Sequence, residues 1–281
     1  MPTRGQHDWM NVLIQCKKNV QERIAPLLKT VKHHQPNLGI GAGGDPIKQV
    51  DLAAENAITE ILKIYLTNFT LISEESGFER FGKNPDECYV TTDPIDGTTN
   101  VFRGIPFYAT SIAVSSRPSL QTVHSALVAD LFHDICYTAQ KGKGAWRNEK
   151  PIAPSTNTSL SEGVIGLDLN SYRIKQLAPR LNKLIENTKH IRHFGANALE
   201  LCYVADGTTD AFIDIRGKLR TTDMAAAWLI INEAGGKITS PDGEQLDVDL
   251  TPKQKVEFVA AANSEMHDAI LRLIKQDDKK Q

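Results

Sequence analysis

Apolar residues recur at three- and four-residue steps in several parts of the chain, which predicts amphipathic helices. The first such pattern covers residues 9–31, and a second covers residues 51–66. The same spacing predicts further helices at residues 174–184, 198–205, 224–234 and 266–274. Gly235 and Gly236, directly after the helix at 224–234, are typical of a left-handed C-terminal cap.

Short runs of β-branched and aromatic residues between these helices predict strands. In the first half of the chain they lie at residues 69–73, 88–92, 108–116, 123–129 and 135–139. We expect the last three of these to form an antiparallel meander. In the second half strands alternate with helices, and lie at residues 164–167, 193–194, 211–215 and 258–262. The pattern as a whole predicts a mixed α/β protein.

The length of 281 residues allows one large domain or two intimate subdomains. The change of pattern places the two subdomains at residues 1–150 and 151–281, and the boundary is soft because no linker or internal repeat marks it. No run of eighteen apolar residues occurs, so we expect no membrane span. The polar start of the chain favours a cytoplasmic protein over a secreted one. A net charge of -2 argues against a nucleic-acid-binding module.

The four cysteines, Cys16, Cys88, Cys136 and Cys202, are far apart and lie in apolar surroundings. This placement favours buried, reduced thiols over disulfides or a zinc site.

The segment from residue 87 to residue 102 carries the strongest chemical signal. Its strand is expected to break at Asp93-Pro94, because proline cannot donate to a sheet and extends the residue before it. Asp96, Gly97 and Thr98 follow, so two carboxylates lie three residues apart on a tight turn. Such carboxylates repel one another unless a cation or a proton intervenes. Since Mg²⁺ prefers oxygen ligands, the segment predicts a magnesium site.

Two further acidic residues stand where a strand ends or a helix begins. Glu74 follows the strand at 69–73, and Asp223 precedes the helix at 224–234. Taken singly, Asp223 is typical of a helix N-cap and Glu74 of a solvated loop. Residues 33–46 contain four glycines and two prolines, which predicts a mobile loop.

Four segments together resemble the inositol monophosphatase family. They are Asp45-Pro-Ile-Lys-Gln-Val-Asp51-Leu-Ala-Ala-Glu55, Ile72-Ser-Glu-Glu-Ser76, Asp93-Pro-Ile-Asp-Gly-Thr-Thr-Asn100, and Leu219-Arg-Thr-Thr-Asp223 followed by Glu233-Ala-Gly-Gly236. Their order and spacing match the family over nearly the whole chain. The loop at 39–51 and the segment Asp214-Ile-Arg-Gly-Lys-Leu-Arg220 are most similar to archaeal members, which act as fructose-1,6-bisphosphatases and inositol-1-phosphatases.

The resemblance implies an α/β (α+β) layered sandwich, the sugar phosphatase fold, with alternating α-β-α-β-α layers. It also implies two to three Mg²⁺ ions, for which Mn²⁺ is a possible substitute. Glu74, Asp93 and the carbonyl oxygen of Ile95 would hold the first ion. Asp93, Asp96 and Asp223 would hold the second, and a third would lie near Glu74 under the glycine loop. Two ions about 3.5–4 Å apart that share Asp93 suit an in-line displacement.

The resemblance further assigns Thr98, with Asp51 behind it, to orient and deprotonate the attacking water, assisted by Glu74. Thr98 alone is also typical of a turn or a helix cap. The backbone of Gly97 and Thr98 would meet the phosphate, as a helix N-terminus does. The rest of the substrate would meet Gly195, Ala196, Asp214, Arg216, Lys218, Arg220, Tyr172 and Arg173.

Some of these substrate contacts have a simpler alternative. Arg216, Lys218 and Arg220 would share one side of an extended strand, and could bind a second phosphate or form a solvated basic face. Tyr172 and Arg173 are also typical of the start of a surface helix.

The expected function is that of a Mg²⁺-dependent phosphomonoesterase that hydrolyses fructose-1,6-bisphosphate and inositol-1-phosphate by direct water attack. Two more residues separate Asp214 from Asp223 than in animal inositol monophosphatases, which argues against strict inositol specificity. The first alternative is a 3'(2'),5'-bisphosphate nucleotidase, although the sequence shows no aromatic platform for adenine. A second, from another class, is a non-catalytic binding protein on the same fold. The resemblance also implies a homodimer.

Overall fold

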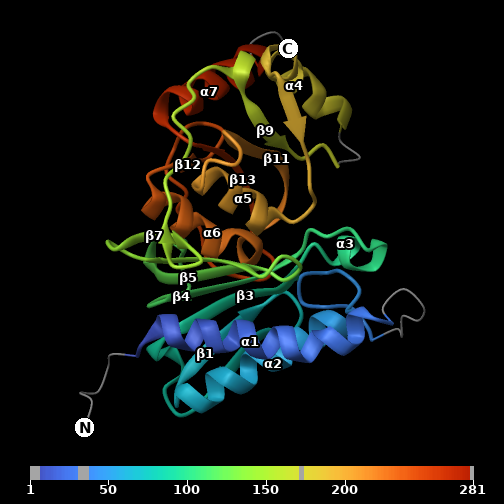
Figure 1. Ribbon diagram of the computed structural model, residues 1–281, viewed down its shortest axis with the longest axis vertical. Coiled ribbons are helices and arrows are strands. Elements are labelled where there is room, and N and C mark those ends of the chain that lie inside the picture. Colours follow the sequence, from blue (N-terminus) through green and yellow to red (C-terminus); the bar gives the residue numbers. More distant parts are fainter. Residues whose placement is uncertain (1–6, 31–37, 171–173, 279–281) are drawn as a thin grey trace.

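The computed structural model describes residues 7–30, 38–170 and 174–278 and consists of five layers (Figure 1). Two helices, α1 (Trp9–Leu28) and α2 (Gln49–Tyr65), cover one face of an eight-stranded sheet. Helices α5 (Asn197–Ala205) and α6 (Thr221–Ala234) separate this sheet from a five-stranded one. The predicted sandwich of alternating α and β layers is therefore confirmed.

The larger sheet has the strand order β2-β1-β3-β4-β5-β6-β7-β8. All neighbouring strands are antiparallel except β1 and β3, which are parallel, and the predicted meander is confirmed within this series. The strands are β1 (Phe69–Ser73), β2 (Gly77–Phe81), β3 (Tyr89–Asp96), β4 (Ala109–Ser115), β5 (Val123–Asp130), β6 (Ile135–Gln140), β7 (Gly144–Arg147) and β8 (Lys150–Pro151). A short helix, α3 (Thr98–Arg103), directly follows β3.

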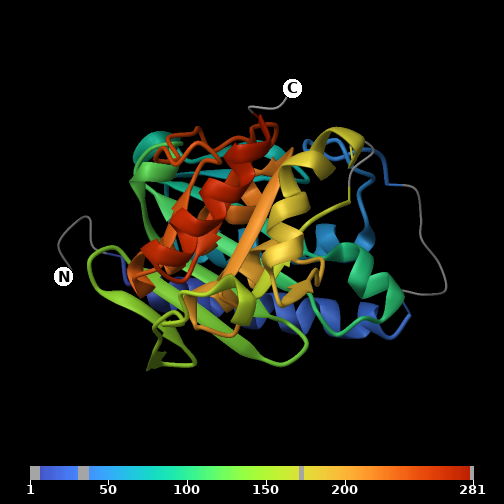
Figure 2. The same cartoon turned by 90° about the horizontal axis from the view of Figure 1, so that it is seen from above.

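The smaller sheet has the order β10-β9-β11-β13-β12. Strand β9 is parallel to β10 and β11, and strand β13 is antiparallel to β11 and β12. Its strands are β9 (Val164–Leu167), β10 (His190–Arg192), β11 (Ala211–Arg220), β12 (Lys237–Thr239) and β13 (Lys255–Ala261). Helices α4 (Ile174–Asn187) and α7 (Ser264–Asp278) lie side by side on its outer face (Figure 2).

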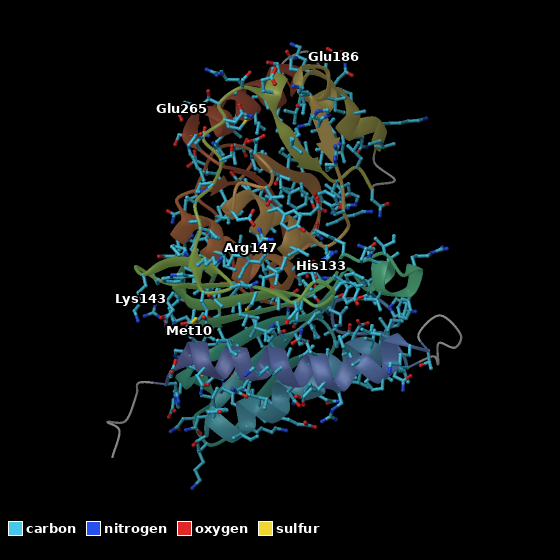
Figure 3. All side chains as sticks on the ribbon, in the orientation of Figure 1. Met10, His133, Lys143, Arg147, Glu186 and Glu265 are labelled. Atoms are coloured by element: carbon cyan, nitrogen blue, oxygen red, sulfur yellow. The ribbon has the colours of Figure 1, made fainter. Side chains whose placement is uncertain are left out.

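Side chains fill the spaces between the layers (Figure 3). One apolar cluster joins strands of the larger sheet to α5, α6 and strands of the smaller sheet. Helix α6 can lie between two sheets because its residues from Thr221 to Ile231 are all buried and include three successive alanines. This cluster contains residues from both halves of the chain, so the apolar core does not separate two subdomains at residue 150. The division at residue 150 therefore stays a prediction.

The short strand predicted at residues 193–194 is wrong, because β10 ends at Arg192. The backbone N–H groups of Phe194 and Gly195 donate instead to the carboxylate of Glu200, so they are not available to a sheet. The largest extensions beyond the predicted strands are those of β3, which continues through Pro94 to Asp96, and of β11, which continues to Arg220.

All four cysteines are free thiols, and three of them are buried as predicted, whereas Cys136 is half-buried. Burial raises the pKa of Cys16 to about 12 and that of Cys88 to about 11, so these thiols are unreactive near neutral pH. Within the described residues, no helix is long and apolar enough to cross a membrane.

Replacing Glu233 with Gln is expected to lower the free energy of unfolding by about 1–2 kcal/mol. Near the C-terminal end of α6, its carboxylate accepts N–H groups from Gly142 (2.8 Å) and Gly144 (2.9 Å), in the turn between β6 and β7. An amide would offer one neutral acceptor for two donors. Urea unfolding measures the change, and Glu186→Gln on the surface of α4 is the matched control. Equal stability of both variants would contradict this role.

Candidate active site

The end of β3 forms the centre of the site. Strand β3 pairs regularly with β4 up to Asp93, and the register shifts between Asp93 and Asp96. Gly97 then turns the chain into α3 with a φ of 87°, where a Cβ would come within 3.1 Å of the carbonyl oxygen of Phe107. Glycine is therefore required for the tight turn that places Asp93, Ile95 and Asp96 at the edge of the sheet.

Three carboxylates from distant parts of the sequence meet at this edge. Oxygen atoms of Glu74, Asp93 and Asp223 all lie within 4.8 Å of one another. Glu74 follows β1 and Asp93 lies in the neighbouring parallel strand, where Ser73 is paired with Thr92. Asp223 lies in the first turn of α6. The sequence predicted all three as metal ligands, and the fold brings them together.

The electrostatics of this cluster favour a bound cation. Burial, followed by the neighbouring carboxylates, raises the pKa of Glu74 and of Asp93 well above its usual range. Burial also raises the pKa of Asp223, against the opposing effect of Arg220. Buried carboxylates that repel one another suit a hard cation such as Mg²⁺, which accepts oxygen ligands and keeps positions open for a phosphate.

The Arg220 guanidinium group lies inside this carboxylate cluster. It contacts Glu74 (2.5 Å), Asp45 (2.7 Å) and Asp223 (3.6 Å). Sequence reasoning assigned Arg220 to the substrate, whereas here it partly compensates the charge of the cluster and connects it to the glycine loop. That loop lies against Glu74, because the N–H of Gly43 donates to the Glu74 carbonyl oxygen (2.7 Å).

Asp96 differs from the other predicted ligands. Its two carboxylate oxygens accept the backbone N–H groups of Asn197 (3.0 Å) and Ala198 (2.7 Å) at the start of α5. It does not belong to the group of three carboxylates, although it lines the same cavity. Burial, then the charge of Asp223, raises its pKa to about 7 against these two hydrogen bonds. Its role as a metal ligand stays a prediction.

Thr98 and Asp51 form the predicted pair beside this cluster. The Thr98 hydroxyl lies 3.1 Å from an Asp51 carboxylate oxygen and 2.9 Å from the Ile95 carbonyl oxygen. A hydroxyl has one proton, so it can donate to one of these acceptors at a time. Burial, then the charge of Glu75, raises the pKa of Asp51 to about 8. Burial, then the charge of Glu55, also raises the pKa of Glu75 to about 7.

These groups open into one cavity of about 800 Å³. Among the residues predicted to contact substrate, Gly97, Thr98, Gly195, Arg216, Lys218 and Arg220 line it. Ala196 and Asp214 are fully buried and do not line the cavity. Tyr172 and Arg173 lie outside the described residues.

Asp214 holds Arg216 in place. Its carboxylate accepts hydrogen bonds from the backbone N–H, Nε (2.9 Å) and Nη2 (2.5 Å) of Arg216. The same Nη2 contacts Asp168 at 2.5 Å. The Arg216 guanidinium is thus already engaged by two buried carboxylates. Lys218 donates to the carbonyl oxygen of Asn170 (3.2 Å), which also accepts a hydrogen bond from Nη1 of Arg216 (3.3 Å).

Sequence reasoning missed several residues of the cavity, namely Asp168, Asn170, His193 and Lys255. Asp168 directly follows β9, just as Glu74 directly follows β1. Two positioning residues were also missed. Glu55 accepts hydrogen bonds from Ser73 and Ser76 around Glu74, and Asn100 donates to the carbonyl oxygens of Phe107 and Phe194.

The chain is similar to several known proteins over nearly its whole length. A fructose-1,6-bisphosphatase/inositol-1-monophosphatase from Methanothermobacter thermautotrophicus is 35% identical over 274 residues, which are 95% of this chain and 96% of the relative. A bifunctional NADP phosphatase/NAD kinase from Methanococcus maripaludis is 34% identical over 94% of this chain, but this chain spans only 49% of its length. A crystal structure described as an inositol monophosphatase-fructose 1,6 bisphosphatase superposes with a TM-score of 0.83 at 33% identity, covering 95% of this chain and all of that one.

Residues 8–279 match the inositol monophosphatase family as a whole. This range includes every carboxylate of the cluster and both sheets. The chain therefore belongs to the inositol monophosphatase family.

Proposed function

We propose that this protein is a Mg²⁺-dependent phosphatase of small sugar and polyol phosphates, with fructose-1,6-bisphosphate and inositol-1-phosphate as its first substrates. One observation carries the proposal: the cluster of Glu74, Asp93 and Asp223 opens into the same cavity as the Thr98–Asp51 pair. The names of its archaeal relatives support the choice of substrates. Mn²⁺ is proposed as a substitute ion.

The metal-binding and proton-transfer roles in the proposed reaction belong to different residues. Glu74, Asp93 and Asp223 would hold Mg²⁺, together with Asp96 and the Ile95 carbonyl oxygen. When bound, Mg²⁺ supplies charge stabilisation to the phosphoryl oxygens and lowers the pKa of water. Thr98 would take a proton from the attacking water as it passes its own proton to the Asp51 carboxylate. A buried carboxylate with a pKa of about 8 suits this task near neutral pH.

The far side of the cavity offers cations for a second phosphate. Lys218 and Lys255 line the cavity wall together with Arg216 and Arg220. We propose that these two lysines meet the second phosphate of a sugar bisphosphate, because an ammonium group binds phosphate as a point charge. Inositol-1-phosphate lacks that group and would depend on the hydroxyl contacts alone.

Two further proposals are a homodimeric assembly, which rests on the family resemblance, and a cytoplasmic location.

A substrate panel with Mg²⁺ tests the proposed function. Phosphate release is expected from fructose-1,6-bisphosphate and inositol-1-phosphate, with kcat/KM at least about tenfold above that for 3'-phosphoadenosine-5'-phosphate and NADP. A factor of ten corresponds to about 1.4 kcal/mol of differential transition-state binding. Turnover of the nucleotides alone would contradict the substrate assignment. No turnover of any phosphate would favour a non-catalytic protein.

A further inference from the structure

His193 connects two buried carboxylates beside the cavity. Its Nδ1 lies 3.4 Å from Glu200, and its Nε2 lies 3.7 Å from Asp168. The two carboxylates come from different elements, since Glu200 lies in α5 and Asp168 follows β9. Their side chains are 2% and 5% exposed, whereas that of His193 is 37% exposed and faces the cavity.

Each carboxylate also fixes a backbone segment of the cavity wall. Glu200 Oε1 accepts the N–H groups of Phe194 (3.0 Å) and Gly195 (2.9 Å), while its buried Oε2 has no hydrogen-bond partner among the described residues. Asp168 accepts the N–H of Asn170 (2.8 Å). The imidazole of His193 therefore joins two anchors of the cavity wall.

The charges around His193 do not balance without it. Asp168, Glu200 and Asp214 bring three carboxylates, and Arg216 contributes one guanidinium group that contacts Asp168 and Asp214. An imidazolium can donate from both ring nitrogens, whereas a neutral imidazole can donate from only one. Deprotonation would remove the positive charge that lies between these two buried carboxylates, and would make the wall more negative towards an anionic substrate.

The groups that face His193 determine the direction in which its pKa shifts. The hydrogen bond to Glu200 raises the pKa of His193, and the charges of Asp168 and Glu200 act in the same direction. Burial and the charge of Arg216 oppose this shift without cancelling it. The imidazolium of His193 therefore persists to a higher pH than that of an ordinary histidine, and is lost as the pH rises further.

We propose that His193 is a positioning and specificity-determining residue, whose protonated form holds the cavity wall and favours binding of the second phosphate of a sugar bisphosphate. This inference rests on the proposed phosphatase function and extends it. It assigns His193 to substrate binding, and leaves the chemistry of phosphate release to the carboxylate cluster and Thr98.

Two variants with a fixed charge test the inference. His193→Arg keeps a positive charge at every pH, and His193→Gln keeps none. For fructose-1,6-bisphosphate, the wild-type KM should match that of the Arg variant at pH 6 and approach that of the Gln variant at pH 9. We expect the two variants to differ in KM by about tenfold, as for the loss of a charge-assisted contact, with similar kcat. Comparison at each pH removes the titration of the substrate itself.

Three controls separate this role from others. With p-nitrophenyl phosphate, which has no second phosphate, the variants should have the wild-type KM. His190→Gln, an exposed histidine on β10, should behave as wild type with both substrates. Thermal unfolding of His193→Gln, compared with wild type, shows whether the variant is folded.

The inference is overturned if the wild-type KM differs from that of the Gln variant by the same factor at pH 6 and pH 9. It is also overturned if both substrates are affected equally, since that result indicates a general structural role. Failure of the proposed function looks different, because the wild-type protein would then release no phosphate from any sugar or polyol phosphate, and the inference would fail with it.

Discussion

Replacing Asp93 with Asn is expected to lower kcat for fructose-1,6-bisphosphate at least about a thousandfold, which corresponds to about 4 kcal/mol of transition-state stabilisation. Asp93 is the carboxylate of the cluster that lies in β3 and is predicted to be shared between two ions. An amide keeps the size of the side chain but offers one neutral oxygen. Phosphate release and Mn²⁺ binding followed by electron paramagnetic resonance should both be lost.

The same substitution should stabilise the protein without metal. The raised pKa of Asp93 shows that burial and Glu74 disfavour its charged form, so a neutral amide removes that cost at neutral pH. Thermal unfolding in a chelator should therefore give a higher midpoint for Asp93→Asn than for wild type. Asp86→Asn is the matched control, because Asp86 pairs with Arg80 on the surface. Wild-type turnover in Asp93→Asn would refute the metal assignment.

The carboxylate cluster could be predicted because local patterns mark its members. Glu74 and Asp93 each lie at the end of an apolar strand, and the two strands are parallel neighbours, so their carboxyl ends reach the same edge. The contact of this edge with Asp223 could not be derived from periodicity, since α6 belongs to the other half of the chain. It was available only from the family resemblance.

The substrate side of the cavity was harder to predict for two physical reasons. Strand β11 is covered on both faces, so Ile213, Asp214 and Ile215 are all buried and alternation does not show which way Asp214 points. The pairing of β11 with β13 is irregular after Asp214, yet Arg216, Lys218 and Arg220 all line the same cavity, as their alternation predicted. Their partners come from distant segments, since Arg216 and Lys218 share the carbonyl oxygen of Asn170 and Arg220 contacts Glu74, and strand alternation does not give these contacts.

His193 carried no signal in the sequence, because a single histidine after a short strand is common. Its significance comes from Asp168 and Glu200, which approach it from β9 and α5 through long-range packing. Asp168, in contrast, could have been predicted, because it is an acidic residue directly after an apolar strand, as Glu74 is.

Magnesium is expected to raise the unfolding temperature more at pH 8 than at pH 6. In the metal-free protein the pKa values of Glu74 and Asp93 are raised, and that of Asp96 reaches about 7. The folded state therefore binds more protons than the unfolded state, whose carboxyl pKa values lie near 4. The stability contributed by these protonated groups is fully present below about pH 4 and is lost as the pH rises through about 7.

Metal binding reverses this dependence, because Mg²⁺ requires the deprotonated carboxylates and binds more tightly as they lose their protons. At a Mg²⁺ concentration of about 100 times Kd, stabilisation of about 2.7 kcal/mol should raise the midpoint by roughly 5–10 °C at pH 8. Differential scanning calorimetry with and without a chelator measures the shift, with KCl at equal ionic strength as one control and Asp93→Asn as the other. Equal shifts at both pH values, or a shift retained in Asp93→Asn, would mean that Mg²⁺ acts elsewhere on the protein and not through this carboxylate cluster.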